Sequence, residues 1–221
     1  MRKEQKANYP ESARGAAALL VRMVLEDGAY TNIALNQYLR GSRLSDLDRR
    51  LATELVYGTV KASGTLDWYL AQCVSRPLDK VAGDILAILR ISTYQLLYMT
   101  RIPASAAVNE AVKLARSVSH EGSAKFVNGV LRGLLRKQEA GAFVLPDAEK
   151  QDADYLSLKY YHPRWLVKRW LGPWGRGGTE RLLAFDNTAA PVCLRANTLV
   201  TTRDKLLADL TEMGAQVRAS E

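Results

Sequence analysis

Residues 78–99 read LDKVAGDILAILRISTYQLLYM and form the most apolar long segment of the chain. At 100° per residue, large apolar side chains fall on nearly every side of a helix built from this segment. A helix of this kind is buried by its neighbours, so we predict that it is central and that other helices pack around it. Asp84, Arg90 and Gln95 interrupt the apolar run, which favours a buried helix over a membrane span.

Helical periodicity continues on both sides of this central segment. Residues rich in Leu, Ala and Val recur three and four positions apart between short turns, and no strand pattern interrupts them. The predicted helices cover about 12–27, a short stretch after Thr31, a stretch that begins at the N-cap Ser45, and residues 65–74, 78–99, 104–118 and 123–138. We therefore predict an all-α domain over residues 12–138.

Composition and charge limit the class of protein. With 221 residues, 48% of them hydrophobic, the chain can bury one large core or two modest ones. A net charge of +8 favours a polyanionic partner, because Lys and Arg release counterions when they bind phosphates. The basic segment 1–11 lacks the apolar core of a signal peptide. We expect a cytoplasmic protein that does not enter a membrane.

Side chains that usually carry chemistry are scarce. Cys73 and Cys193 stand in different apolar segments, and His120 and His162 lack companions at metal-ligand spacing. We expect both cysteines to be packing residues and predict no disulfide, nucleophile or metal site. The glycines in residues 172–178 follow a helix rather than a strand, so they predict a flexible turn and not a cofactor-binding loop.

The character of the chain changes after residue 138. Residues 139–154 contain Gly, Pro and several carboxylates and predict a linker, and residues 155–187 predict junction helices. Residues 188–221 contain the strand-like PVCLRAN, the capped helix TTRDKLLADLTEMG and the strand-like AQVRA. Such a β-α-β unit cannot bury its own core, so we expect it to be the incomplete start of a larger α+β domain.

The predicted helix 123–138 is strongly amphipathic. Its apolar residues cover one arc, and the opposite arc carries Lys125, Asn128, Arg132 and Arg136. This polar stripe could follow a phosphate backbone or could be an ordinary solvated face. Gly129 and Gly133 lower the helix propensity and suggest that a neighbouring backbone approaches closely.

The stretch 160–170 reads YYHPRWLVKRW and combines rings with cations. On a helix with Pro163 at its first position, one apolar arc contains Leu166, Val167, Trp170 and Leu171. We predict that this arc docks the helix at the junction between the helical domain and the β-α-β unit. Trp165 falls on the other side with Lys168 and Arg169, where it could stack on a base or cover the stems of the two cations.

Three segments carry a resemblance to a known family: LATELVYGTVKASGTLDWYL, LAILRISTYQLLYMTRIPASAAVNEAVKLAR and KFVNGVLRGLLR. Together they resemble the NusB-like, all-helical RNA-binding domain of the RsmB (Sun, Fmu) family of ribosomal RNA cytosine-5 methyltransferases. The resemblance covers about residues 12–138. YYHPRWLVKRWL and PVCLRANTLVTTRDKLLADLTEMGAQV look like the connecting helix and the start of the RRM-like N-terminal subdomain of these enzymes.

The resemblance implies S-adenosylmethionine as cofactor of a full-length parent enzyme, but no catalytic or cofactor-binding residue of this chain. The family's Gly-rich loop and Pro-Cys motif are absent, and neither Cys73 nor Cys193 occupies a matching position. The implied role is to position structured ribosomal RNA for a catalytic domain outside these residues. Contact with a ribosomal protein or transcription factor remains open, and we expect a monomer.

Two alternatives remain at this point. One is a NusB-like transcription antitermination factor without enzyme activity, and the other is a helical protein-interaction module with no RNA role. The candidate RNA contacts are Arg2, Lys3, Lys6, Arg14, Lys125, Asn128, Arg132, Arg136, Trp165, Lys168 and Arg169. Arg14 is the strongest candidate near the N-terminus, because a predicted helix fixes its position.

Overall fold

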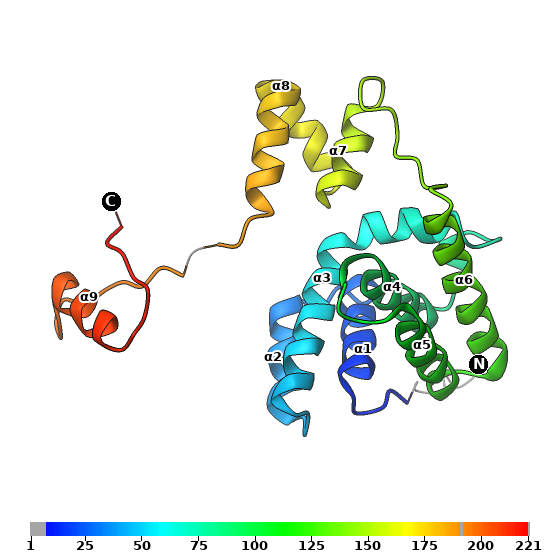
Figure 1. Cartoon of the computed structure of the whole chain (residues 1–221), viewed down its shortest axis with the longest axis horizontal. Helices are drawn as coiled ribbons and strands as arrows, with labels where there is room; N and C mark the ends of the chain where they lie inside the picture. The colour runs from blue at the N-terminus through cyan, green and yellow to red at the C-terminus, as the bar shows by residue number, and fades with distance from the viewer. Residues whose placement is uncertain (1–7, 191, 221) are drawn as a thin grey trace. The chain divides into compact units, whose positions relative to one another are not determined.

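The computed structural model describes residues 8–190 and 192–220. These residues form two compact units, with the boundary between Ala184 and Phe185. Figure 1 shows the helices of the larger unit in blue to yellow-orange and the single helix of the smaller unit in red. In the part of the chain that the structure describes, none of the helices has the length and apolar character needed to cross a membrane.

Eight α-helices and one 3₁₀ turn begin in the described part of the larger unit. They are α1 (Ala13–Leu25), α2 (Thr31–Gly41), α3 (Asp46–Ala71), η1 (Leu78–Lys80), α4 (Gly83–Tyr98), α5 (Ala104–Val118), α6 (Glu121–Glu139), α7 (Asp152–Tyr160) and α8 (Arg164–Asp186). Side-chain caps fix several of their beginnings: Ser12 accepts from the backbone N–H of Gly15, and Ser45 accepts from that of Asp48.

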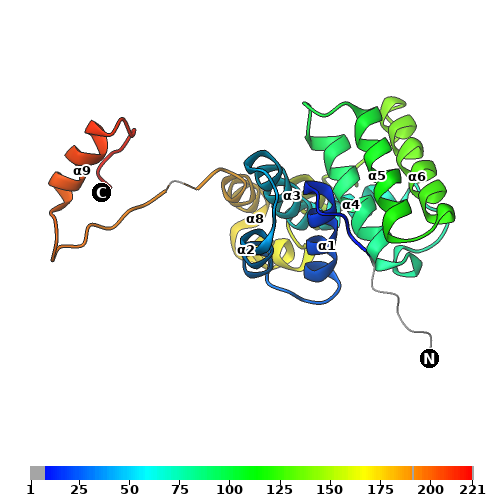
Figure 2. The same ribbon diagram turned by 90° about the horizontal axis from the view of Figure 1, so that it is seen from below.

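Helix α4 is the centre of the main core, as its sequence predicts. It packs against α1, α3, α5 and α6. Figure 2 shows it between α1 and α3 on one side and α5 and α6 on the other. Its buried apolar residues lie on several sides of the helix, among them Ile85, Leu86, Ile88, Leu89 and Ile91. Burial on all sides explains why its sequence lacks the polar face of a surface helix.

Helix α3 is longer than its sequence suggests. The structure has one continuous helix from Asp46 to Ala71, where the pattern of turn residues predicts two separate helices. The buried residues in the middle of α3 recur at spacings of three and four, and they are Leu55, Thr59, Ala62 and Leu66. They therefore lie on one side of a continuous helix. Packing of this face outweighs the cost of about 1 kcal/mol that each internal glycine adds.

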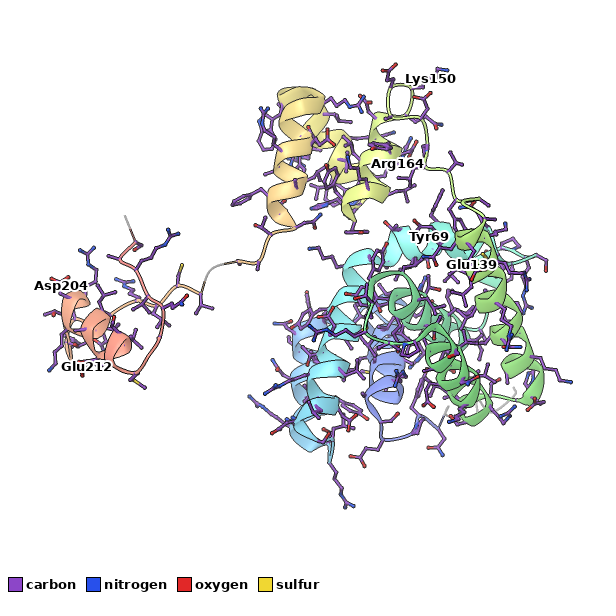
Figure 3. The ribbon with its side chains drawn as sticks, in the orientation of Figure 1. Tyr69, Glu139, Lys150, Arg164, Asp204 and Glu212 are labelled. Carbon is purple, nitrogen blue, oxygen red and sulfur yellow. The ribbon has the colours of Figure 1, made fainter. Side chains whose placement is uncertain are left out.

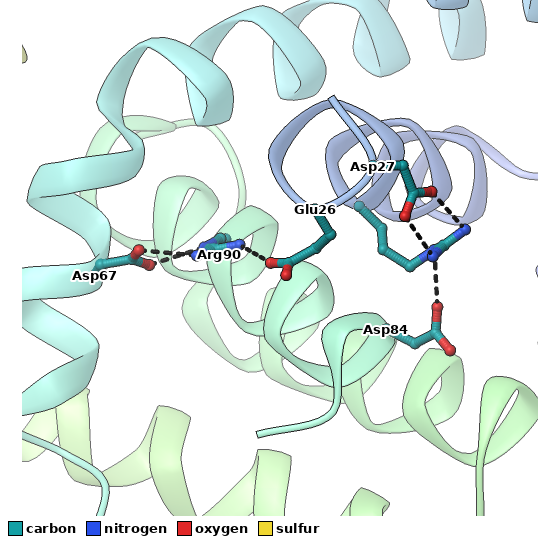
Figure 4. A network of polar contacts seen from close by, with 6 residues as sticks. Glu26, Asp27, Asp67, Asp84 and Arg90 are labelled. Carbon is teal, nitrogen blue, oxygen red and sulfur yellow. Dashed lines mark hydrogen bonds and ion pairs between the residues drawn. The ribbon is translucent and has the colours of Figure 1, made fainter. Parts of the chain in front are cut away.

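A buried arginine ties three helices of the core together. Arg90 on α4 is 8% exposed, and its Nε and Nη2 donate to the two carboxylate oxygens of Asp67 on α3, both at 2.8 Å. Its Nη1 donates to Glu26, the C-cap of α1, at 2.9 Å (Figure 4). Burial alone would lower the pKa of Arg90, but these hydrogen bonds raise it, so the side chain stays charged.

The segment before α1 crosses the helix at a glycine. The Pro10 carbonyl oxygen lies 2.1 Å from the point that a Cβ at Gly15 would occupy. Tyr9 donates its hydroxyl to Asp84 Oδ1 at 2.6 Å and packs against the main core. Gly15 is therefore required by a backbone crossing.

Helices α7 and α8 form a second, smaller core. Leu156, Val167 and Leu183 are fully buried in it, and Trp170 and Leu171 pack against them. Helix α8 is interrupted at Gly175, whose φ of 59° and ψ of −179° are almost confined to glycine. The apolar arc predicted for residues 163–171 thus packs against α7 and the second half of α8.

Contacts with α3 and α4 hold α7 in the larger unit. Thr65 on α3 donates its hydroxyl to the backbone oxygen of Leu158 at 2.9 Å. Tyr161 follows α7 in a left-handed conformation, and its ring meets that of Tyr98 edge-on at 5.6 Å. Figure 3 labels Glu139, Lys150 and Arg164 along the connection from α6 to α8.

The smaller unit confirms the predicted helix but not its flanking strands. Helix α9 (Arg203–Glu212) begins after the N-cap Thr202, and Gly214 with φ of 80° follows it. No strand forms in the described residues, which differs from the strands expected at PVCLRAN and AQVRA. Two strands alone would leave their edges unpaired and could not form a hydrophobic core. Val192 and Cys193 are accordingly exposed. The expectation that Cys193 packs in a core is wrong here.

Candidate nucleic-acid interface

The strongest candidate surface lies on α6, which packs against α4 and α5 with one face. His120 caps its beginning by accepting from the Ser123 backbone N–H, which gives this histidine a structural role. Its inner arc packs against α4 and α5 through Ala124, Val127, Val130, Leu131 and Leu134. Anchored in this way, α6 presents its opposite arc to solvent as a fixed surface.

Three cations form a row along that outer arc. Lys125, Arg132 and Arg136 are exposed, and none of them forms an ion pair with a carboxylate among residues 8–190 and 192–220. Asn128 is half-buried and accepts a hydrogen bond from Arg132 Nε at 2.9 Å. We call these four residues the α6 stripe. Because none of the three cations is held in an ion pair, the α6 stripe attracts anions.

A surface hollow of about 340 Å³ adjoins the α6 stripe. We call it the glycine hollow; it is lined by Gln72, Cys73, Gly129, Gly133, Arg136, Lys137, Ala140 and Ala142. Lys137 donates its Nζ to the Gln72 backbone oxygen at 2.6 Å and so fixes the wall towards α3. Burial raises the pKa of the Cys73 thiol, although Lys137 acts in the opposite direction, so Cys73 stays protonated and is not an activated nucleophile.

The two glycines do not have the role that their spacing suggests. Nothing lies within 4 Å of a Cβ built on Gly129, and only the Arg136 Nη2, at 3.9 Å, lies near one built on Gly133. The expected close approach of a neighbouring backbone is therefore absent from the described structure. Each glycine costs about 1 kcal/mol of helix stability relative to alanine, and no contact among the described residues explains that cost.

Arg14 has a structural role that its sequence position does not reveal. Its Nε donates to Gln95 Oε1 at 2.8 Å, and Gln95 is buried in α4 with its own amide donating to the Ile91 oxygen. Arg14 thus links α1 to α4. Arg2, Lys3 and Lys6 lie outside the described residues.

A second patch of candidates lies on α8. Trp165 is 66% exposed, and Lys168 and Arg169 are exposed beside it. Among the residues that the structure describes, no cation lies over the Trp165 ring, whereas Lys159 covers the rings of Tyr155 and Tyr160. The Trp165 face is open, while Trp170 stacks on Trp174 at 6.1 Å.

Two cations near the α6 stripe are not among the candidate RNA contacts predicted from the sequence. Lys137 lines the glycine hollow, and the Arg76 guanidinium lies 4.7 Å from the centre of the Phe126 ring. Arg76 precedes Pro77 in a turn, so no helical periodicity could place it beside α6. In the described chain, no group of three or more His, Cys, Asp or Glu residues is arranged to hold a metal ion.

The described residues 13–139 form an all-helical domain in which an apolar central helix is surrounded by others and a helix with exposed cations lies on its surface. The NusB family model matches residues 11–136, more than half of the chain, and the chain belongs to this family. A second model, the ferredoxin-like domain of RsmF/B-like methyltransferases, matches residues 162–221. The second match supports the α+β class expected for the C-terminal segment.

Relatives that match almost the whole of this chain are longer than it is. The chain is 38% identical over 208 residues to the probable ribosomal RNA small subunit methyltransferase B of Synechocystis sp., covering 94% of this chain and 46% of that protein. It is 33% identical over 210 residues to the Bacillus subtilis protein of the same name, covering 95% and 46%. The chain therefore spans about half the length of these relatives.

The solved structures support the helical fold. In the crystal structure of the antitermination factors NusB and NusE with double-stranded RNA, one chain matches with a TM-score of 0.53 and 21% identity. The match covers 58% of this chain and 96% of that one. At this identity the likeness shows the fold alone.

Proposed function

We propose that this chain is the RNA-binding region of a ribosomal RNA cytosine-5 methyltransferase and positions structured ribosomal RNA for a catalytic domain outside residues 1–221. The observation that carries the proposal is the α6 stripe: three exposed cations are fixed on a packed helix, and none forms an ion pair with a carboxylate among the described residues. Phosphate contacts fix the register of an RNA without reading its sequence, which suits a positioning domain. We propose ribosomal RNA as the substrate because the relatives are named as ribosomal RNA methyltransferases.

The family also suggests a cofactor, partners and a location for the parent enzyme. S-adenosylmethionine would bind the catalytic domain of the parent enzyme, since no motif for it occurs in this chain. We place the protein in the cytoplasm because its relatives are named as ribosomal RNA methyltransferases, and we propose that it acts as a monomer. A protein contact of the kind that NusB makes with NusE stays a second possibility, because the fold is shared with that complex.

Reversing two charges of the α6 stripe tests the proposal. Arg132→Glu with Arg136→Glu should weaken binding of a labelled ribosomal RNA hairpin about 10- to 100-fold, because phosphate contacts are lost and like charges repel. The salt dependence should fall by roughly 1.5 in the slope of log affinity against log salt, since each phosphate contact contributes about 0.7–0.9. Fluorescence anisotropy at several salt concentrations measures both quantities.

The matched control reverses two exposed cations on α3. Arg50→Glu with Lys61→Glu changes the net charge equally and should reduce RNA affinity much less, because these residues lie outside the α6 stripe. Equal losses in both double variants would mean that overall charge, and not the α6 stripe, drives binding. A wild-type chain whose RNA affinity does not change with salt would refute the electrostatic mechanism.

Trp165 is proposed to stack on an unpaired base next to Lys168 and Arg169. Removing the ring in Trp165→Ala should weaken RNA binding about fivefold or more, because stacking contributes about 1–3 kcal/mol per base. Trp165→Phe keeps an aromatic face and should restore most of the affinity. Circular dichroism checks the fold, and a folded Trp165→Ala protein with wild-type affinity would remove Trp165 from the interface.

A further inference from the structure

The glycine hollow combines three features that no contact within the described chain accounts for. It is open, it is lined by Gly129 and Gly133, whose Cβ positions meet no close packed neighbour, and it borders three cations that form no ion pair among the described residues. The residues that line it include two cations, Arg136 and Lys137, and no carboxylate. The space is therefore suited to an anionic ligand from outside the chain.

Helix geometry places the glycines and the cations in two adjacent rows. At 100° per residue, Lys125, Arg132 and Arg136 lie within about 40° of one another around α6. Gly129 and Gly133 follow about 60° to one side, each three residues before a stripe arginine. The two rows run side by side for more than one turn, so a chain-like ligand can contact both.

The position of Arg136 connects the two rows. Its Nη2 lies 3.9 Å from the point that a Cβ at Gly133 would occupy, so the guanidinium leans over this glycine. Lys137 is held by the Gln72 carbonyl on the opposite wall. An anionic group in the glycine hollow would have a cation on each side, within the reach of charge-assisted hydrogen bonds.

We infer that the sugar-phosphate backbone of the bound RNA passes over Gly129 and Gly133 through the glycine hollow, with Arg136 and Lys137 on its two sides. This inference rests on the proposed RNA-binding function and adds the path of the RNA across α6. The missing side chains let the backbone come close enough for Arg136 to reach a phosphate oxygen directly. Alanine methyl groups at these two positions would fill this path.

Gly129→Ala with Gly133→Ala, made in the 221-residue chain, tests the path. Alanine has the higher helix propensity and meets no close packed neighbour at either position, so the melting temperature should equal or exceed that of the wild type. The dissociation constant for a fluorescein-labelled ribosomal RNA hairpin should nevertheless rise about tenfold, by loss of direct phosphate contact. Improved stability with weakened binding is the expected signature.

Gly64→Ala is the matched control. Gly64 is exposed within α3, nothing lies within 4 Å of its Cβ position, and it does not line the glycine hollow. This variant should gain thermal stability in the same way and keep wild-type RNA affinity. An equal loss of affinity in Gly64→Ala would overturn the inference, because the effect would then follow from helix propensity.

The outcomes separate this inference from the function on which it rests. Wild-type affinity in the glycine double variant, with weakened binding after charge reversal of Arg132 and Arg136, overturns the path and leaves the function standing. A wild-type chain without salt-dependent RNA binding overturns the function itself. If the glycine variant keeps its RNA affinity but loses binding to a purified ribosomal protein, the hollow belongs to a protein partner and the inferred path is wrong.

Discussion

Arg90→Met is expected to lower the free energy of unfolding by about 2–3 kcal/mol. The substitution removes three hydrogen bonds that join α4 to α3 and α1 and leaves Asp67 and Glu26 facing each other without a cation. The full cost of breaking a buried pair is about 3–5 kcal/mol, but the carboxylate side chains are 32% and 38% exposed and can be rehydrated. Urea denaturation followed by circular dichroism measures the loss.

Arg22 provides the comparison for this experiment. It also lies close to two carboxylates, Asp27 at 3.1 Å and Asp84 at 3.2 Å, but its side chain is 31% exposed. Exposed ion pairs contribute about 0–1 kcal/mol, so Arg22→Met should destabilise the chain much less than Arg90→Met. Similar losses in the two variants would show that burial of Arg90 does not set its contribution.

Gly15→Ala is expected to destabilise the chain by about 1–3 kcal/mol, even though alanine favours a helix. The new methyl group would overlap the Pro10 carbonyl oxygen, 2.1 Å from the Cβ position, and that oxygen belongs to the backbone and not to a flexible side chain. The crossing segment would have to shift, and the hydrogen bond from Tyr9 to Asp84 would weaken with it. Thermal unfolding measures the effect as a lowered melting temperature.

A lowered melting temperature in Gly15→Ala would distinguish a steric clash from a change in helix propensity, which would raise it. Gly64→Ala, at an exposed position of α3 with open space around it, should raise the melting temperature. The opposite signs come from the presence or absence of a neighbour at the Cβ position. A stabilised Gly15→Ala protein would show that the segment before α1 moves away at little cost.

The helices that the sequence predicts well are those in which the distribution of apolar and polar side chains determines which faces are buried. Helix α4 is apolar all round and is central, and α6 is amphipathic and lies outside with Lys125, Arg132 and Arg136 exposed. In both cases the distribution of side chains around the helix determines how much of it can face water. Trp165 is exposed on α8 for the same reason.

The features that the sequence does not reveal depend on contacts between distant residues. Arg90 looks like an interruption of an apolar run, and only the fold brings Asp67 and Glu26 to it. Arg14 looks like a free cation, but Gln95 accepts one of its hydrogen bonds. The sequence does not distinguish Gly15, whose Cβ position is occupied by a crossing backbone, from Gly129, whose Cβ position faces open space. Spacing along the chain cannot separate these cases.

The connection from α6 to α7 is attached to α3 at two points, and the turn between them is held by Asp147, which accepts from the backbone N–H groups of Glu149 and Lys150. Phe143 meets the Tyr69 ring edge-on at 4.7 Å, and the Thr65 hydroxyl holds the Leu158 carbonyl. Residues 144–150 thus form a loop whose ends are already closed by α3. Doubling the length of such a loop costs only about 0.6 kcal/mol in closure entropy. An inserted tag or fluorophore at Lys150 is therefore expected to disturb the turn at Asp147 but to leave α7 on α3 and both cores intact.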